Sequence, residues 1–168
     1  MRIQRGVGLV EVLVALVVLS IAVLGFVALQ IRGVAASEEA GKNVQAINLA
    51  RDLSERMRMN RNGLLSYQKN TDTTNCVEIF CTPTNMAKYD FRQVYTRAQA
   101  LGMDLDVVDC QGMKPEFKRK CIYVAWGETV AADVSSLPEG KTVENACTDG
   151  ASYVNGANCV IVEVYNYE

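Results

Sequence analysis

The chain has 168 residues, of which 49% are hydrophobic and 21% charged, and its formal net charge is −2. This length suits one domain of ordinary size. The absence of histidine excludes Ser-His and Cys-His nucleophilic pairs, imidazole metal ligands and the usual general base at neutral pH. The slight acidity argues against nucleic acid as a partner, since dedicated nucleic-acid-binding proteins are normally basic. We therefore expect neither an enzyme nor a bound cofactor.

An uncharged apolar segment lies close to the N-terminus. No charged residue stands between Glu11 and Arg32, and every face of a helix drawn through this stretch is apolar. At about 1.5 Å of rise per residue, such a helix spans roughly 30 Å, the thickness of the hydrocarbon core of a bilayer. Arg2 and Arg5 precede the segment, so the positive-inside rule places the N-terminus in the cytoplasm and sends the rest of the chain across the membrane.

Glu11 stands at the edge of this segment. A carboxylate drawn to the bilayer centre costs about 2.5–3.5 kcal/mol, and less near the interface. One interpretation is that Glu11 only reaches toward the lipid headgroups. The other gives it a partner, a positive charge at the same depth supplied by another chain. An ordinary signal peptide cut after Ala36, which would release a secreted disulfide-rich binding protein, is the alternative interpretation of the whole segment.

The residues around the segment resemble the class III signal of type IV pilins and pseudopilins. A basic leader MRIQRG, residues 1–6, is followed by VGLVE, residues 7–11, and then by the apolar run. In that family the prepilin peptidase cuts after the glycine, and the new N-terminal residue is methylated. The resemblance therefore implies cleavage between Gly6 and Val7, N-methylation of Val7, and pairing of Glu11 with the N-terminal ammonium of a neighbouring subunit during assembly.

Three positions depart from the common pilin pattern. Val7 stands where phenylalanine is usual, Gly8 where a small hydroxylic residue is usual, and Ala28 where major pilins place a proline. These departures favour a minor over a major filament subunit.

Helical periodicity continues beyond the apolar segment. Apolar residues between residues 42 and 59 recur at three- and four-residue spacing and form one stripe: Ala46, Leu49, Ala50, Leu53 and Met57. The pattern predicts one helix from Val7 to about Asn62, with Gly63 as its stop. After the leader, residues 7–31 are expected to be the transmembrane and assembly part, and residues 32–63 the amphipathic second half.

The end of this helix resembles one group within the type IV pilins. The stretch LARDLSERMRMNRNG, residues 49–63, is similar to the end of the first helix in the PilV group of minor pilins, the type IV pilus modification proteins. That implies a minor pilin that primes pilus assembly and sits at or near the tip, with other minor pilins, the major pilin and a tip adhesin as partners. Before assembly it would be a single-pass inner-membrane protein with a cytoplasmic N-terminus and a periplasmic head. A minor pseudopilin of a type II secretion system is the alternative.

Residues 64–168 are expected to form the exported α+β head. Apolar residues at helical spacing predict a second, shorter helix over residues 86–101, ended by Gly102. The predicted fold is thus pilin-like and α+β: a long N-terminal helix packed on a small antiparallel sheet, with a second short helix and disulfides.

Alternating apolar residues predict the strands of that sheet over residues 121–126 and 159–165, with residues 104–108 as a candidate short strand. The polar stretch over residues 131–158 is expected to be an exposed functional loop.

All six cysteines lie on the exported side of the apolar segment. They indicate disulfides in an oxidising compartment. No pair has C-x-x-C spacing and histidine is absent, so no metal or redox site is expected. The composition leaves the connectivity open. The preferred pairing is sequential because each loop is then short: Cys76–Cys81, Cys110–Cys121 and Cys147–Cys159.

Overall fold

The computed structural model describes residues 8–70, 72–111 and 119–165. The chain divides into two units, Met1–Gly41 and Lys42–Glu168. The described part of the first unit is helical, and the second unit contains helices, two sheets and the hydrophobic core. This composition is the pilin-like α+β fold that the sequence predicted.

Helix α1 (Leu9–Met59) runs without interruption through the apolar segment and the amphipathic stripe. The stripe is confirmed, since Ala46, Leu49, Ala50, Leu53 and Met57 are all buried. A short 3₁₀ helix, η1 (Arg61–Ser66), follows α1 after one residue. The long helix therefore ends at Met59, three residues before the predicted end.

The prediction that Gly63 stops the long helix is wrong. Gly63 lies inside η1, is buried, and has no positive φ. Its role is close approach: a Cβ there would collide with the carbonyl oxygen of Pro83 and with the Asn60 side chain, whose Nδ2 donates to the same oxygen at 2.7 Å. The missing side chain thus lets η1, just after α1, approach the start of the second helix.

This contact predicts that Gly63→Ala destabilises the head. Backbone must move to admit the new methyl group, and overpacking of this kind costs about 1–3 kcal/mol. Urea unfolding of the full chain in detergent micelles measures the effect. Gly41→Ala is the matched control, because nothing lies within 4 Å of a Cβ at Gly41 and alanine favours the helix. Equal midpoints for the two variants would contradict the close contact at Gly63.

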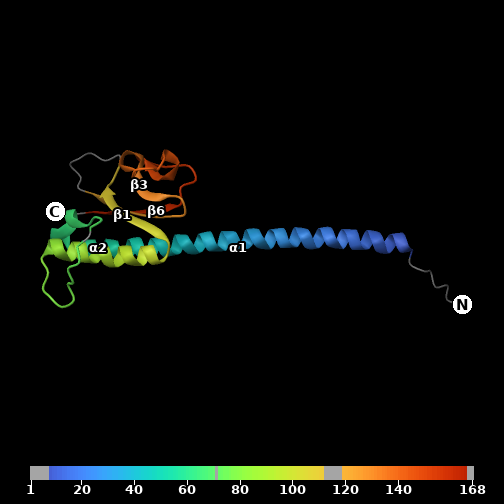
Figure 1. Ribbon diagram of the computed structural model, residues 1–168, viewed down its shortest axis with the longest axis horizontal. Helices are drawn as coiled ribbons and strands as arrows, with labels where there is room; N and C mark the ends of the chain where they lie inside the picture. Colours follow the sequence, from blue (N-terminus) through green and yellow to red (C-terminus); the bar gives the residue numbers. More distant parts are fainter. Residues whose placement is uncertain (1–7, 71, 112–118, 166–168) are drawn as a thin grey trace. The chain divides into compact units, whose positions relative to one another are not determined.

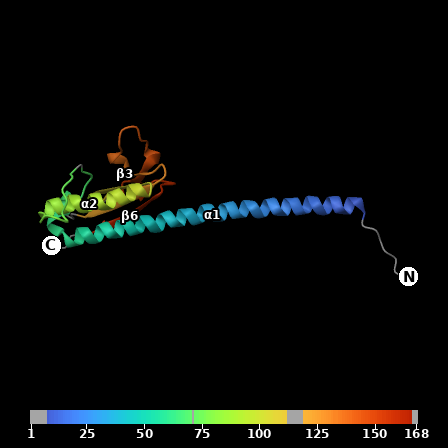
Figure 2. The same cartoon turned by 60° about the horizontal axis from the view of Figure 1, so that its bottom comes forward.

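Helix α2 (Pro83–Ala100) is the predicted second helix, begun three residues earlier. Thr82 caps it by accepting a hydrogen bond from the Asn85 amide at 3.3 Å, and Pro83 occupies the first turn, where its missing N–H is no loss. Gly102, with φ +69°, ends the helix as predicted. Figures 1 and 2 both show α2 alongside the C-terminal end of α1, the part that belongs to the second unit.

The first sheet has the order β1-β2-β6 and is antiparallel. Its strands are β1 (Met103–Asp109), β2 (Lys120–Trp126) and β6 (Cys159–Val164). The register places Leu105 opposite Val124 and Val124 opposite Val160, so apolar residues share one face. All three predicted strands are confirmed, and that face packs on the helices.

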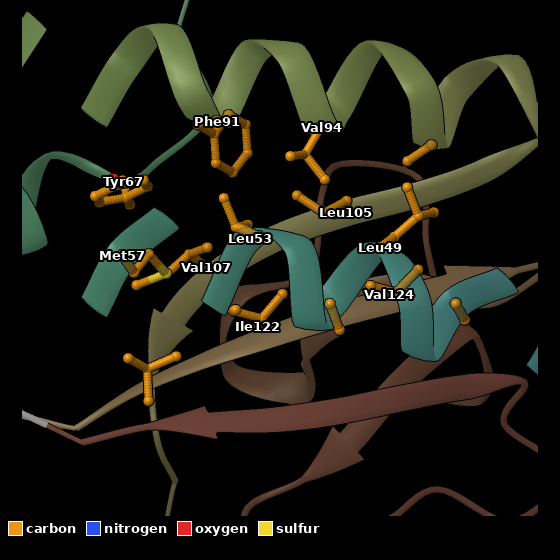
Figure 3. Packing of buried hydrophobic residues seen from close by; sticks show 14 of the residues in the cluster. Leu49, Leu53, Met57, Tyr67, Phe91, Val94, Leu105, Val107, Ile122 and Val124 are labelled. Carbon is orange, nitrogen blue, oxygen red and sulfur yellow. The ribbon is translucent and has the colours of Figure 1, made fainter. Parts of the chain in front are cut away.

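The main core lies between this face and the helices. Leu53 of α1 lies at its centre, with Phe91 of α2 on one side and Ile122 of β2 on the other (Figure 3). Tyr67, just after η1, closes one end of the same cluster. The apolar stripe of α1 is thus covered by both α2 and the sheet.

The predicted exposed loop over residues 131–158 is wrong in part, because short strands in this stretch form a second sheet on the other face of the first. Residues 135–144, between two of these strands, are largely exposed. Strands β3 (Val130–Asp133), β4 (Ala146–Asp149) and β5 (Ser152–Tyr153) make it up in that order, β3 parallel and β5 antiparallel to β4. It also contains the 3₁₀ turns η2 (Val134–Ser136) and η3 (Val143–Asn145). The strands escaped prediction because they have only two to four residues, too few to establish an alternating pattern.

A buried carboxylate holds the second sheet together. Asp133 accepts hydrogen bonds from the Ser135 amide at 3.0 Å, the Thr148 hydroxyl at 2.9 Å and the Gly150 amide at 2.8 Å. The Tyr123 hydroxyl of β2 lies 3.0 Å from the same Thr148 oxygen. Burial by itself would raise the pKa of Asp133, but the hydrogen bonds, led by Ser135, outweigh it and hold the pKa below its ordinary value.

Candidate functional site: the apolar helix and its carboxylate

Glu11 lies in the first turn of α1 and is exposed. Its amide donates to the Gly8 carbonyl at 3.0 Å as the helix begins. A carboxylate at this end is stabilised by the positive end of the helix dipole. Among the residues that the structure describes, no cation pairs with Glu11, so its charge is available to a group outside this part of the chain.

The surface of α1 around Glu11 is apolar on all sides. Every residue from Gly8 to Glu38 is exposed, including all the large aliphatic side chains between Leu9 and Val34. An 18-residue window of α1 has a mean hydropathy of 3.1, and the helix is long and apolar enough to cross a membrane, by length and composition. The Ser20 hydroxyl donates to the Leu16 carbonyl at 2.7 Å, which satisfies it within the helix. An apolar surface of this extent requires lipid or protein to cover it.

A network of charges joins α2 to α1 in the second unit. Arg56 donates to Asp52 on its own helix and to Asp90 of α2, each at 2.8 Å. Arg97 of α2 donates to Asp52 at 2.9 Å. The hydrogen bond that Arg56 donates to Asp52, followed by the one that it donates to Asp90, raises the pKa of Arg56 against the opposing effect of burial. The network fixes α2 where it covers the apolar stripe of α1.

Tyr67 connects η1 to the same network. Its hydroxyl lies 3.1 Å from the carbonyl oxygen of Arg56 and 3.1 Å from a carboxylate oxygen of Asp90. Burial is the main cause that raises the pKa of Tyr67, so the hydroxyl stays protonated and able to donate. The i,i+4 spacing of Asp52 and Arg56 is visible in the sequence. Asp90 and Tyr67 come from other segments, so no sequence pattern predicts that they join this network.

The three disulfides of the structure are Cys76–Cys81, Cys110–Cys121 and Cys147–Cys159, which is the sequential pairing. The third joins β4 of the second sheet to β6 of the first. The sulfurs of Cys110 and Cys121 also lie within 4.8 Å of a Glu163 carboxylate oxygen. This cluster offers no metal site while the disulfide is intact, because the metal ligand is the free thiolate.

The predicted processing site at Gly6 and Val7 lies outside the described residues. Cleavage and methylation there are therefore tested by determining the N-terminus of the mature chain. The predicted assembly residue, Glu11, lies within the described part of the chain.

Two family models match the chain. Residues 1–27 match the prokaryotic N-terminal methylation motif. Residues 28–92 match the model described as type IV pilin Tt1218. The chain carries the signatures of a type IV pilin. No curated protein and no solved structure matched it.

These matches agree with the helical geometry described above. The methylation motif implies processing by a prepilin peptidase, and it covers Glu11 and most of the apolar segment. The Tt1218-like match runs through the second half of α1 into α2. A pilin or pseudopilin role with membrane anchoring is therefore supported, and such a role is structural, not catalytic.

Proposed function

We propose that the chain is a minor pilin of the PilV type that is incorporated into the type IV pilus, where it primes assembly at or near the tip. The observation that supports this most directly is Glu11, a charge without a described partner in the first turn of a helix that is apolar on every face. Such a helix is stable among lipids or among other apolar helices, and its carboxylate needs a cation at the same depth.

The proposed cation is the N-terminal ammonium of a neighbouring subunit, created by cleavage between Gly6 and Val7. Methylation of the Val7 nitrogen keeps its positive charge. In the low dielectric of packed helices, attraction between the two charges is much stronger than in water. The pairing fixes the axial register of the entering subunit, because the carboxylate must lie at the depth of its neighbour's N-terminus.

This proposal assigns a role to each segment of the chain. Residues 1–6 are the leader, residues 7–31 the transmembrane and assembly helix, residues 32–63 its amphipathic half, and residues 64–168 the head. Before assembly the chain spans the inner membrane once, with its N-terminus in the cytoplasm and its head in the periplasm. Its proposed partners are other minor pilins, the major pilin and a tip adhesin.

A minor pseudopilin of a type II secretion system is the second candidate, because the methylation motif and the apolar helix serve both machines. The PilV-like stretch over residues 49–63 favours the pilus. Release as a secreted binding protein after Ala36 is disfavoured, because the Tt1218-like match runs across this position and the helix continues through it.

The intact N-terminus tests the proposal. Mass spectrometry of a membrane-plus-pilus fraction is expected to find a chain that begins at Val7 and is heavier by one methyl group. A Gly6→Val variant is the control, since a bulky residue at the scissile position should preserve the leader. A chain that begins at Ser37 would overturn the pilin proposal, and a methylated chain absent from sheared surface fibres would favour the secretion machine.

A further inference from the structure

The loop closed by the Cys76–Cys81 disulfide carries an apolar surface. Val77, Ile79 and Phe80 are all exposed, and the Phe80 side chain has no shielding from solvent. Met59, the last residue of α1, is also largely exposed. Contiguous exposed apolar side chains mark interaction sites more often than chance surface, and aromatic residues are prominent among the anchors of interfaces.

A groove of about 680 Å³ lies beside Phe80. Met59 of α1, Phe80 of the loop, and Pro83 and Met86 at the start of α2 supply its apolar lining. Asp52, Glu55 and Asp90 place carboxylates around it. We call this surface, with Val77 and Ile79, the Phe80 groove. It is large enough for the side chains of a short peptide segment.

The charged residues that line the Phe80 groove are Asp52, Glu55, Asp90 and Arg56, so carboxylates outnumber cations in its lining. Asp52 and Asp90 are bound by Arg56 and Arg97. Glu55 is exposed, and no cation among the described residues pairs with it. Glu78, between the apolar residues of the loop, is exposed as well. The surface therefore presents apolar side chains together with surplus negative charge.

The loop closed by the Cys76–Cys81 disulfide is ordered in the absence of a partner. The disulfide ties its two ends. The segment before it is anchored on α2, where Arg92 donates to the carbonyls of Asp72 and Thr74 and Lys88 pairs with Asp72 at 3.2 Å. A surface that is already ordered loses little conformational entropy on binding.

We propose that the Phe80 groove binds another protein chain through an apolar side chain that has a lysine or arginine beside it. The apolar side chain enters the groove and the cation meets Glu55. Charge complementarity of this kind selects the partner and orients it. An anionic lipid surface fits less well, because Glu55 and Glu78 would repel it. The inference rests on the proposed function in one respect: we expect the partner to be a protein of the fibre.

Site-specific photocrosslinking in the full chain tests this inference. p-Benzoylphenylalanine replaces Val77 in cells that produce the protein, and irradiation is followed by mass-spectrometric mapping of the adduct. The expected adduct joins position 77 to an apolar stretch that contains Lys or Arg on a different protein. Glu55→Lys and Phe80→Ala are each expected to lower its yield about ten-fold or more, the effect of losing one interface anchor.

Matched controls separate this surface from general damage. Glu139→Lys and Tyr153→Ala likewise change a glutamate and an aromatic residue, at exposed positions of the second sheet region, and are expected to leave the adduct unchanged. Glu55→Gln, which keeps the shape, should lower the yield less than Glu55→Lys. Disulfide formation in every variant, measured by non-reducing electrophoresis, verifies the fold.

Several outcomes would overturn the inference: an adduct only with a second copy of this chain, an adduct only with lipid, no adduct, or a yield insensitive to Glu55→Lys. Sheared fibres from the same cells separate its failure from that of the proposed function. A chain present in fibres without the adduct overturns the docking surface alone. A chain absent from fibres that still forms the charge-sensitive adduct overturns the pilus role alone.

Discussion

Glu11→Ala is expected to remove the protein from sheared pili while leader cleavage and the folded head persist. The variant leaves the N-terminal ammonium of a neighbouring subunit without its counter-ion in an apolar environment. An uncompensated buried charge of this kind costs about 3–5 kcal/mol, which corresponds to a loss of about a hundred-fold or more in incorporation. The head should be unaffected, because Glu11 belongs to the first unit and the hydrophobic core lies in the second.

Immunoblots of the sheared fibre fraction and of whole cells measure this loss. Ser20→Ala is the matched control: Ser20 lies on the same exposed helix and bonds only to its own backbone among described contacts. Glu11→Asp keeps the charge and should restore part of the incorporation, whereas Glu11→Gln should not. Normal amounts of the alanine variant in the fibre would mean that Glu11 only reaches toward the headgroups, the simpler interpretation of this residue.

The elements predicted correctly are those whose signal repeats along the sequence. The stripe of α1 extends over several turns, and Val94 and Phe91 of α2 belong to a similar repeat. Strands β2 and β6 are seven and six residues long and consist mainly of apolar residues. Burial on one face imposes the period of the helices, and burial on both faces gives β2 its continuous apolar run. The core that these elements form can therefore be inferred before its partners are known.

The second sheet illustrates what such patterns miss. Its strands are short, and its central contact is made by polar groups: Asp133 binds Thr148 and Gly150 across the sheet. Asp, Thr and Gly in a polar stretch also favour turns. The sequence therefore predicted a loop where a hydrogen-bonded carboxylate replaces the usual apolar pairs.

The assembly helix and the Phe80 groove also differ in how far each can be recognised from the sequence. Glu11 and the apolar segment are contiguous in sequence, so the assembly helix could be recognised without a structure. The Phe80 groove combines the end of α1, the disulfide loop and the start of α2. Gly63 brings two of these segments together, and its role was misread because a glycine near a helix end usually indicates a stop.

Leu53→Ala is expected to destabilise the head more than any surface change, by about 2–5 kcal/mol. Leu53 is completely buried and lies between Phe91 of α2 and Ile122 of β2 (Figure 3). Its removal leaves a cavity where both helices and the first sheet meet. The surrounding groups cannot close it freely, because the charge network of Arg56 and Asp90 fixes the two helices.

Urea unfolding of the full chain in micelles, followed by the fluorescence of Trp126, measures this effect, since Trp126 belongs to the same core. Leu65→Ala provides the matched control, because Leu65 is 68% exposed and its loss should change the free energy of unfolding by less than about 0.5 kcal/mol. A midpoint for Leu53→Ala no lower than that for Leu65→Ala would mean that α1 is not covered by α2 and the sheet. A lower midpoint for Leu53→Ala together with normal leader cleavage would show that the head and the assembly helix are stabilised separately. The proposed role requires such separate stability, because the subunit leaves the membrane with its head already folded.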